Sequence, residues 1–281
     1  MLPCSRNWGC ATETGEPLLE RALACELAAI AARGGERRLE PPGGRVDFVT
    51  NDYLGLSRHP EVIEGARQAL ERHGAGGRSA RLLGGGTELE GELERAVAEW
   101  LGAEDALLFP SGYQANLGVV GALAGSGDAV LCDELVHASL IDAARLSRAR
   151  VSVYQHGDMA DLDRVLRETE RARRRVVLTE GVFSMDGDRP PLAEMAELCR
   201  RHGAVLVVDE AHAVGLLGSG SRPGAGAWAL THADGEDADV LAARIVTGGK
   251  ALGVAGALVV GSRAMRAICV NRARSFMFTT A

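Results

Sequence analysis

The chain has 281 residues, of which 46% are hydrophobic and 25% charged, and its formal net charge is −7. This composition is typical of a globular protein with an ample core, and the acidic balance argues against a nucleic-acid partner or an anionic membrane surface. The six cysteines, at positions 4, 10, 25, 132, 199 and 269, form no Cys-x-x-Cys pair. We therefore expect reduced thiols, no metal site and a cytoplasmic location.

The first 46 residues are expected to form a separate N-terminal segment. Residues 1–17 are expected to be disordered or poorly packed, and they lack the basic start and apolar run of a signal peptide. Apolar residues at helical spacing then predict a helix over about 18–33, which ends near Gly34-Gly35. The polar stretch Pro41-Pro42-Gly43-Gly44 is typical of a linker.

From residue 47 to residue 281, short apolar runs alternate with amphipathic stretches. Thr87 and Glu90 form a capping box, and the helix that they begin is expected to end at Gly102. Strands are predicted at about 106–109, 129–133, 151–154, 176–180, 205–209, 244–247 and 257–261, and further helices at about 113–123, 138–147, 159–169, 192–202 and 263–272. Apolar strands separated by helices predict an α/β fold with a mainly parallel seven-stranded sheet, flanked by helices. Residues 106–127 are uncharged, but their glycines and polar residues argue against a membrane span.

Three chemically active side chains follow two of these strands. Asp209 and His212 come at the end of the strand at 205–209, and Lys250 follows the strand at 244–247. Ligands of parallel sheets bind beyond the carboxyl ends of the strands, so we expect these side chains to meet. A desolvated lysine can form a Schiff base, and a carboxylate can keep a pyridine nitrogen protonated. The set therefore points to pyridoxal 5′-phosphate (PLP).

The letters Asp-Glu-Ala-His at 209–212 also occur in helicase-type nucleotide sites, which is a rival interpretation. That interpretation needs a phosphate loop, Gly-x-x-x-x-Gly-Lys-Ser/Thr. The only Gly-Lys pair is Gly249-Lys250, where Ala251 replaces the hydroxyl residue and Arg244 replaces the first glycine. The helicase interpretation is therefore rejected.

Seven stretches together resemble one family, the α-oxoamine synthases, which are PLP enzymes of fold type I. They are, in chain order, Asn51–Leu56, Ser111–Asn116, His137–Ser139, Glu180–Gly187, Asp209–His212, Thr247–Lys250 and Phe276–Ala281. One such match would be weak, but seven in the order of the family are specific. The resemblance implies that residues 47–281 form the PLP-binding large domain of this family.

The resemblance also implies roles for residues around the PLP ring. Lys250 would form the Schiff base and then move protons at the α-carbon of the substrate. Asp209 would pair with the pyridinium nitrogen, His212 would bond to the phenolic oxygen of the ring, and His137 would stack on the ring. Ser184 would approach the cofactor near the phenolic oxygen.

Other residues would hold the phosphate and the substrate. The strand–helix turn Ser111-Gly112-Tyr113 suits a phosphate because backbone N–H groups point outward there. Thr247 would add a hydroxyl to the same phosphate. In the family the active site lies between two subunits, so a homodimer is implied, with Thr279 or Thr280 of the neighbouring subunit on the phosphate. Asn51 would help to hold the substrate carboxylate.

The reaction implied by the resemblance is the decarboxylating condensation of an amino acid with an acyl thioester. The favoured substrates are L-alanine and pimeloyl-CoA, as in biotin synthesis. Sister enzymes of the family join glycine to acetyl-CoA, glycine to succinyl-CoA, or serine to a long acyl-CoA, and these alternatives stay open.

The resemblance also sets an expectation about the end of the chain. Members of the family continue beyond the Thr-Thr-Ala stretch into a small C-terminal domain, which holds an arginine for the amino-acid carboxylate. This sequence stops at Ala281, so we expect that the small domain is absent from it. A PLP-binding fragment without full activity is therefore the second hypothesis.

Overall fold

The computed structural model describes residues 18–39, 46–232 and 239–280. Internal contacts divide the chain into two units, Met1–Val49 and Thr50–Ala281. In the first unit the predicted helix is present as α1 (Leu18–Ala32), with Leu19, Leu23 and Leu27 exposed. The predicted disordered start and the linker at 41–44 lie outside the described residues.

Within the described part of the second unit, seven strands form one sheet in the order β1-β7-β6-β5-β4-β2-β3. The strands are β1 (Asp105–Phe109), β2 (Ala129–Asp133), β3 (Arg150–Tyr154), β4 (Arg175–Glu180), β5 (Val205–Asp209), β6 (Leu241–Thr247) and β7 (Ala257–Gly261). Strand β7 is antiparallel to its neighbours β1 and β6, and the other neighbouring pairs are parallel. The predicted α/β fold with a mainly parallel sheet is therefore confirmed.

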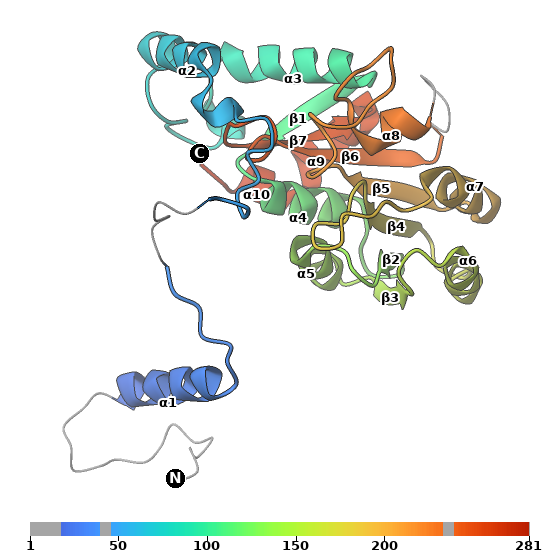
Figure 1. Cartoon of the computed structure of the whole chain (residues 1–281). Coiled ribbons are helices and arrows are strands. Elements are labelled where there is room, and N and C mark those ends of the chain that lie inside the picture. Colours follow the sequence, from blue (N-terminus) through green and yellow to red (C-terminus); the bar gives the residue numbers. More distant parts are fainter. Residues whose placement is uncertain (1–17, 40–45, 233–238, 281) are drawn as a thin grey trace. The chain divides into compact units, whose positions relative to one another are not determined.

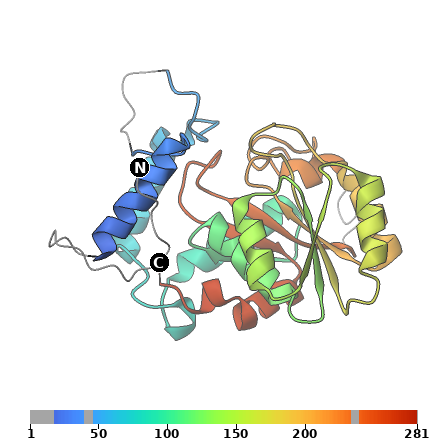
Figure 2. The ribbon, with the colours of Figure 1, turned by 90° about the horizontal axis from the view of Figure 1, so that it is seen from below.

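Helices cover both faces of this sheet (Figures 1 and 2). One face packs on α4 (Gly112–Leu123), α5 (Ala138–Leu146), α9 (Arg263–Arg272) and α10 (Arg274–Met277). The other face packs on α3 (Glu88–Leu101), α6 (Met159–Glu168), α7 (Leu192–His202) and α8 (Gly226–Thr231). The apolar strands are buried on both sides because each face has its own core cluster, which explains why they show no alternation of polar residues.

Three elements were not predicted: α2 (Pro60–His73), α8 and α10. Helix α2 has no buried residue in this structure, but Pro60 at its start, apolar residues at helical spacing and Gly74 after its end are signals that could have predicted it. Helix α8 has only six residues and α10 only four, which is too short for a helical period to be visible. Two short 3₁₀ turns, η1 (Leu56–Arg58) and η2 (Arg81–Leu83), complete the described elements.

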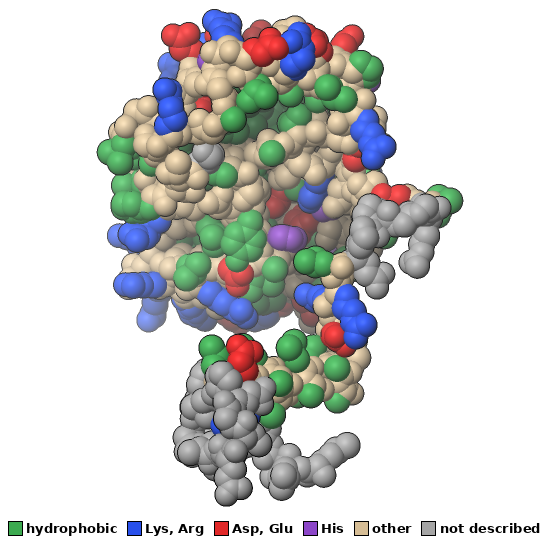
Figure 3. Space-filling view, turned by 90° about the vertical axis from the view of Figure 1, so that its left-hand side faces the viewer, with side chains coloured by type: hydrophobic (Ala, Val, Ile, Leu, Met, Phe, Trp, Pro, Cys, Tyr) green, Lys and Arg blue, Asp and Glu red, His purple; other side chains and the backbone are tan. Residues whose placement is uncertain are grey.

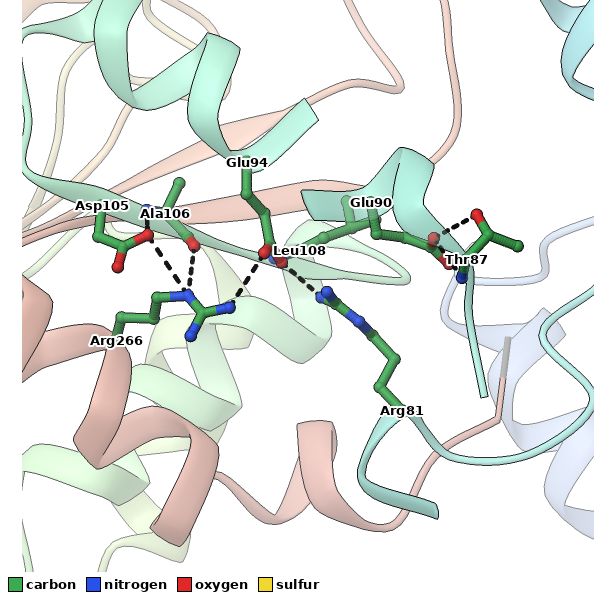
Figure 4. Close-up of polar contacts among 8 residues, drawn as sticks. All are labelled: Arg81, Thr87, Glu90, Glu94, Asp105, Ala106, Leu108 and Arg266. Atoms are coloured by element: carbon green, nitrogen blue, oxygen red, sulfur yellow. Dashed lines mark hydrogen bonds and ion pairs between the residues drawn. The ribbon is translucent and has the colours of Figure 1, made fainter. Parts of the chain in front are cut away.

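A buried carboxylate fixes α3 to the edge strand β1, as Figure 4 shows. Glu94 accepts a hydrogen bond of 2.8 Å from the backbone N–H of Leu108 and one of 3.2 Å from Nη2 of Arg266 on α9. Arg81 also pairs with Glu94. One turn earlier, the predicted capping box of Thr87 and Glu90 is formed. These contacts hold the end of β1, from which the chain passes to the start of α4.

No helix in the described ranges is both long and apolar enough to cross a bilayer.

Candidate functional site

The candidate site lies where parallel strands end. Glu180 is the last residue of β4 and is paired in register with Asp209, the last residue of β5, which is itself opposite Ile245 of β6. The segments after β5 and β6 carry His212 and Lys250 to the same edge of the sheet. On the face of the molecule seen in Figure 3, histidine, acidic and basic side chains gather in one recessed area.

Lys250 and His212 are in direct contact. Lys250 Nζ lies 2.6 Å from His212 Nε2, and His212 Nδ1 lies 2.7 Å from the hydroxyl of Tyr53. Burial lowers the pKa of Lys250, although the charges of Asp209 and Glu180 raise it in part. Burial, together with the charge of Lys250, lowers the pKa of His212 to about 4. The imidazole is therefore neutral near pH 7, and the amine is easier to deprotonate than an exposed lysine.

Asp209 is buried, with only 5% of its surface exposed. Its Oδ2 accepts a hydrogen bond of 2.7 Å from the side-chain amide of Asn116 on α4, and its Oδ1 accepts one of 3.0 Å from the backbone N–H of Ala211. The same Asn116 amide donates to Ser139 Oγ at 2.8 Å. These donors fix the direction of the carboxylate, whose charge acts on Lys250.

His137 is the N-cap residue of α5, beside the end of β4. Its backbone N–H donates a hydrogen bond of 2.6 Å to Glu180 Oε1, and its Nδ1 lies 2.8 Å from Ser139 Oγ. Burial and the charge of Asp209 together raise the pKa of Glu180 to about 7, against the effect of the His137 N–H. The site thus holds two neighbouring carboxyl groups, and Glu180 takes up a proton near neutral pH.

A cradle for an anion is formed where α4 begins. Ser111 caps this helix by accepting a hydrogen bond of 3.3 Å from the backbone N–H of Gln114. A Cβ atom on Gly112 would lie 2.6 Å from Thr247 Oγ1, so a glycine is needed for the threonine hydroxyl to reach this helix end. Tyr113 turns its side chain toward α5 and donates a hydrogen bond of 2.5 Å to Asp142. Free backbone N–H groups and a hydroxyl at a helix N-terminus suit a phosphate.

The other predicted residues lie further from this network. Thr279 Oγ1 accepts a hydrogen bond of 3.2 Å from the side chain of Gln114, so the segment after α10 approaches α4, whereas Thr280 is exposed. Ser184 is exposed in the turn after β4. Asn51 accepts a hydrogen bond of 2.9 Å from the hydroxyl of Tyr53.

Four residues of the network had no role in the sequence-based prediction: Tyr53, Asn116, Ser139 and Glu180. Each lies inside one of the stretches that carry the family resemblance, and that position was the signal that could have identified them. The sequence also supports the choice of Lys250, because it is the only lysine among the 281 residues. The chain therefore has a single side-chain amine that can form a Schiff base.

No group of three or more His, Cys, Asp or Glu side chains is arranged to hold a metal ion in the ranges that the structure describes.

Comparison with protein families gives a match over residues 44–281 to the family described as aminotransferase class I and II. Among curated proteins, the 8-amino-7-oxononanoate synthase of Anaeromyxobacter sp. (strain Fw109-5) is 49% identical over 268 residues, which are 91% of this chain and 66% of that protein. The enzyme of the same name from Mycobacterium sp. (strain KMS) is 48% identical over 86% of this chain and 62% of its own length. The chain thus spans slightly less than two thirds of these relatives.

Solved structures of related enzymes are similar to this chain in fold. A serine palmitoyltransferase from S. paucimobilis with a bound PLP–myriocin aldimine has a TM-score of 0.82 and 29% identity, over 95% of this chain and 71% of that one. The 8-amino-7-oxononanoate synthase from Francisella tularensis has a TM-score of 0.71 and 28% identity, over 85% of this chain and 64% of that one. The resemblance to the α-oxoamine synthases is therefore confirmed, and this chain belongs to the aminotransferase class I and II family.

Proposed function

We propose that this chain binds PLP at the ends of β4, β5 and β6 and takes part in the condensation of an amino acid with an acyl thioester. The observation that carries the proposal is the position of Lys250. Lys250 is the only lysine of the chain, is half-buried and contacts His212. The charge of the buried Asp209 acts on its pKa. A desolvated amine beside a buried carboxylate is the arrangement that PLP chemistry uses.

The residues present fit the cofactor at both of its ends. At one end, the N-terminus of α4 and the hydroxyl of Thr247 form the anion cradle, which an added Cβ on Gly112 would fill. At the other end, Asp209 is held by two N–H donors and offers its negative charge to a pyridinium nitrogen. His137 lies beside the same region, at the start of α5, and is the candidate for stacking on the ring.

When bound, PLP supplies a ring that withdraws electrons from the α-carbon of an attached amino acid. The chain's own groups would do the rest. Lys250, with its lowered pKa, would hold the cofactor and then take the proton from the α-carbon. Asp209 would keep the ring nitrogen protonated, and Asn51 would help to orient the substrate carboxylate.

We further propose L-alanine and pimeloyl-CoA as the substrates, because the curated relatives at 48–49% identity are named 8-amino-7-oxononanoate synthase. The proposed reaction joins the two with loss of CO₂ and CoA, as in biotin synthesis. The structural similarity to serine palmitoyltransferase supports the sister reaction, serine with a long acyl-CoA, as the alternative.

A homodimer in the cytoplasm is part of the proposal. The dimer follows from the family resemblance, in which Thr279 or Thr280 approaches the phosphate of the neighbouring subunit. Cys132, Cys199 and Cys269 are buried free thiols, which agrees with a reducing compartment. Light scattering across a dilution series is the measurement, and a monomer at all concentrations would contradict the dimer.

The function is tested by following the exchange of the α-proton of amino acids in D₂O by NMR with PLP-loaded protein. L-Alanine should exchange faster than glycine or serine, and addition of pimeloyl-CoA should release CoA. Asp209→Asn should still bind PLP but exchange at least about a hundredfold more slowly, because a neutral amide does not stabilise the protonated ring. Bound PLP without any exchange would favour the second hypothesis, a PLP-binding fragment.

A further inference from the structure

Tyr53 connects two distant parts of the chain at the candidate site. Its hydroxyl lies 2.7 Å from Nδ1 of His212, which is 159 residues away in the sequence, and donates a hydrogen bond of 2.9 Å to Asn51 Oδ1. The two rings are 6.1 Å apart between centroids, at an angle of 53°. Tyr53 is 43% exposed, so it lies at the edge of the site and not in its core.

The hydrogen bond from Tyr53 to Asn51 indicates which ring nitrogen of His212 carries the proton. A tyrosine hydroxyl has one proton to donate, and Tyr53 donates it to Asn51. With the side-chain amide of Asn51 oriented to accept from Tyr53, the contact of 2.7 Å with His212 uses a proton on Nδ1, and the tyrosine oxygen is the acceptor. Because a neutral imidazole has only one N–H, Nε2 is left with a lone pair that points at Lys250 Nζ, 2.6 Å away.

The electrostatic surroundings agree with a neutral imidazole. Burial and the charge of Lys250 lower the pKa of His212 to about 4, while Asp209 acts in the opposite direction and His137 in the same one. Burial also raises the pKa of Tyr53, so its hydroxyl keeps its proton. Near pH 7 the Tyr53 hydroxyl and the neutral His212 ring therefore carry one proton each. If Tyr53 donates its proton to Asn51, His212 is the donor in the contact between the two rings.

We propose that Tyr53 is a positioning residue that orients the ring of His212 and holds its proton on Nδ1, so that Nε2 faces Lys250. This inference deepens the proposed function. It rests on that function only in one respect, the contact between Nε2 of His212 and PLP. Tyr53 itself touches neither Lys250 nor the anion cradle in the contacts given above, so it acts through His212.

The test is the tautomer of His212 in cofactor-free protein, read from ¹⁵N NMR of labelled imidazole nitrogens. The wild type should carry its proton on Nδ1. Tyr53→Phe removes the acceptor and should shift the population toward Nε2–H. Asn51→Ala frees the tyrosine proton, which can then be donated to Nδ1, and should also favour Nε2–H. Tyr154→Phe, which removes a hydroxyl that donates to Leu178 in the sheet, should leave the signals unchanged.

The NMR result decides the inference whether or not PLP binds. Unchanged His212 signals in Tyr53→Phe, or an Nε2–H tautomer in the wild type, would overturn it. A second measurement connects it to the cofactor: Tyr53→Phe should weaken PLP binding by about three- to tenfold, the usual effect of one lost hydrogen bond. A changed tautomer with unchanged PLP affinity would overturn that connection, whereas absence of PLP binding in every variant would refute the proposed function alone.

Discussion

The side-chain amide of Asn116 donates a hydrogen bond of 2.7 Å to Oδ2 of Asp209. Asn116 lies on α4, the same helix whose N-terminus forms the anion cradle at Ser111 and Gly112. One helix therefore fixes both the phosphate end of the proposed PLP site and the carboxylate at the pyridine end. The distance between the two ends is set by about one turn of helix, which is more rigid than a loop.

Asn116→Leu should destabilise the cofactor-free protein. The change removes a donor from the buried Asp209 and from Ser139, and a buried carboxylate that loses a donor costs about 1–3 kcal/mol. The free energy of unfolding in urea is the measurement. Asn271→Leu on α9, where the exposed amide donates only to the backbone of its own helix, is the matched control. Equal stability of the two variants would show that the contact with Asp209 contributes nothing.

Gly112→Ala should impair PLP binding without unfolding the protein. The new methyl would lie 2.6 Å from Thr247 Oγ1 and would fill the cradle, so PLP affinity should fall at least about tenfold. Gly121→Ala on the same helix is the control, because nothing lies within 4 Å of an added Cβ there. That control should bind PLP normally and gain about 0.5–1 kcal/mol from the better helix former. Normal affinity of Gly112→Ala would place the phosphate elsewhere.

Glu180 should make the cofactor-free protein less stable as the pH rises. The pKa of its carboxyl is raised to about 7 in the folded chain, mainly by burial, so the folded state binds this proton more tightly than the unfolded state. The cost therefore begins above the unfolded value of about 4.5 and is complete above about pH 7. Glu180→Gln, which keeps the oxygen that accepts from His137, should remove this cost and add a few kcal/mol of stability at pH 8.

The difference in unfolding free energy between Glu180→Gln and the wild type separates the effect of Glu180 from that of His212. The lowered pKa of His212 makes stability rise with pH between about 4 and its ordinary value, which is the opposite slope. Glu92→Gln, an exposed change on α3, is the control and should follow the wild type at every pH. A stability gain for Glu180→Gln that is the same at pH 5 and pH 8 would contradict the raised pKa.

His156 should hold the turn after β4 more tightly at low pH. Its Nδ1 lies 2.8 Å from Asp133 and its Nε2 2.8 Å from Asp188, so both nitrogens act as donors only in the charged ring. Burial lowers the pKa of His156, but the hydrogen bonds to the two aspartates raise it overall. The stabilisation is therefore complete below its ordinary value and is lost as the pH rises through the raised pKa.

Hydrogen exchange of the turn measures this effect. The amide of Phe183 donates to the backbone of Asp188 at 3.0 Å, and it should exchange faster in His156→Asn than in wild type below the raised pKa. His202→Asn, which removes a contact with Asp163 on another surface, should leave the turn protected. Equal protection of Phe183 in wild type and His156→Asn at acidic pH would refute the role of His156.

The main elements of the fold could be predicted from the sequence because each leaves a local pattern. All seven strands begin and end within a few residues of the predicted positions, since uninterrupted apolar runs are characteristic of strands buried on both faces. The capping box at Thr87 is equally local. Helix α2 could also have been predicted, because it begins at Pro60, places apolar residues at helical spacing and ends before Gly74.

The candidate site could be predicted only in part. Asp209, His212 and Lys250 follow strand ends, and strand order brings such positions together. Contacts between distant segments leave no such pattern: Tyr53 meets His212 across 159 residues and Asn116 meets Asp209 across 93. Ser184 was selected by family resemblance alone, and its exposed position gives that choice no support from contacts.

The central claim is that PLP is held covalently by Lys250, and borohydride reduction followed by peptide mass spectrometry tests it most directly. Because Lys250 is the only lysine, the amino-terminal amine is the one competing group of comparable reactivity. We predict one fixed cofactor per chain, on the peptide that contains Lys250, and no label in Lys250→Arg, which has no lysine left. Label on the amino terminus alone, or none on folded protein, would contradict the account.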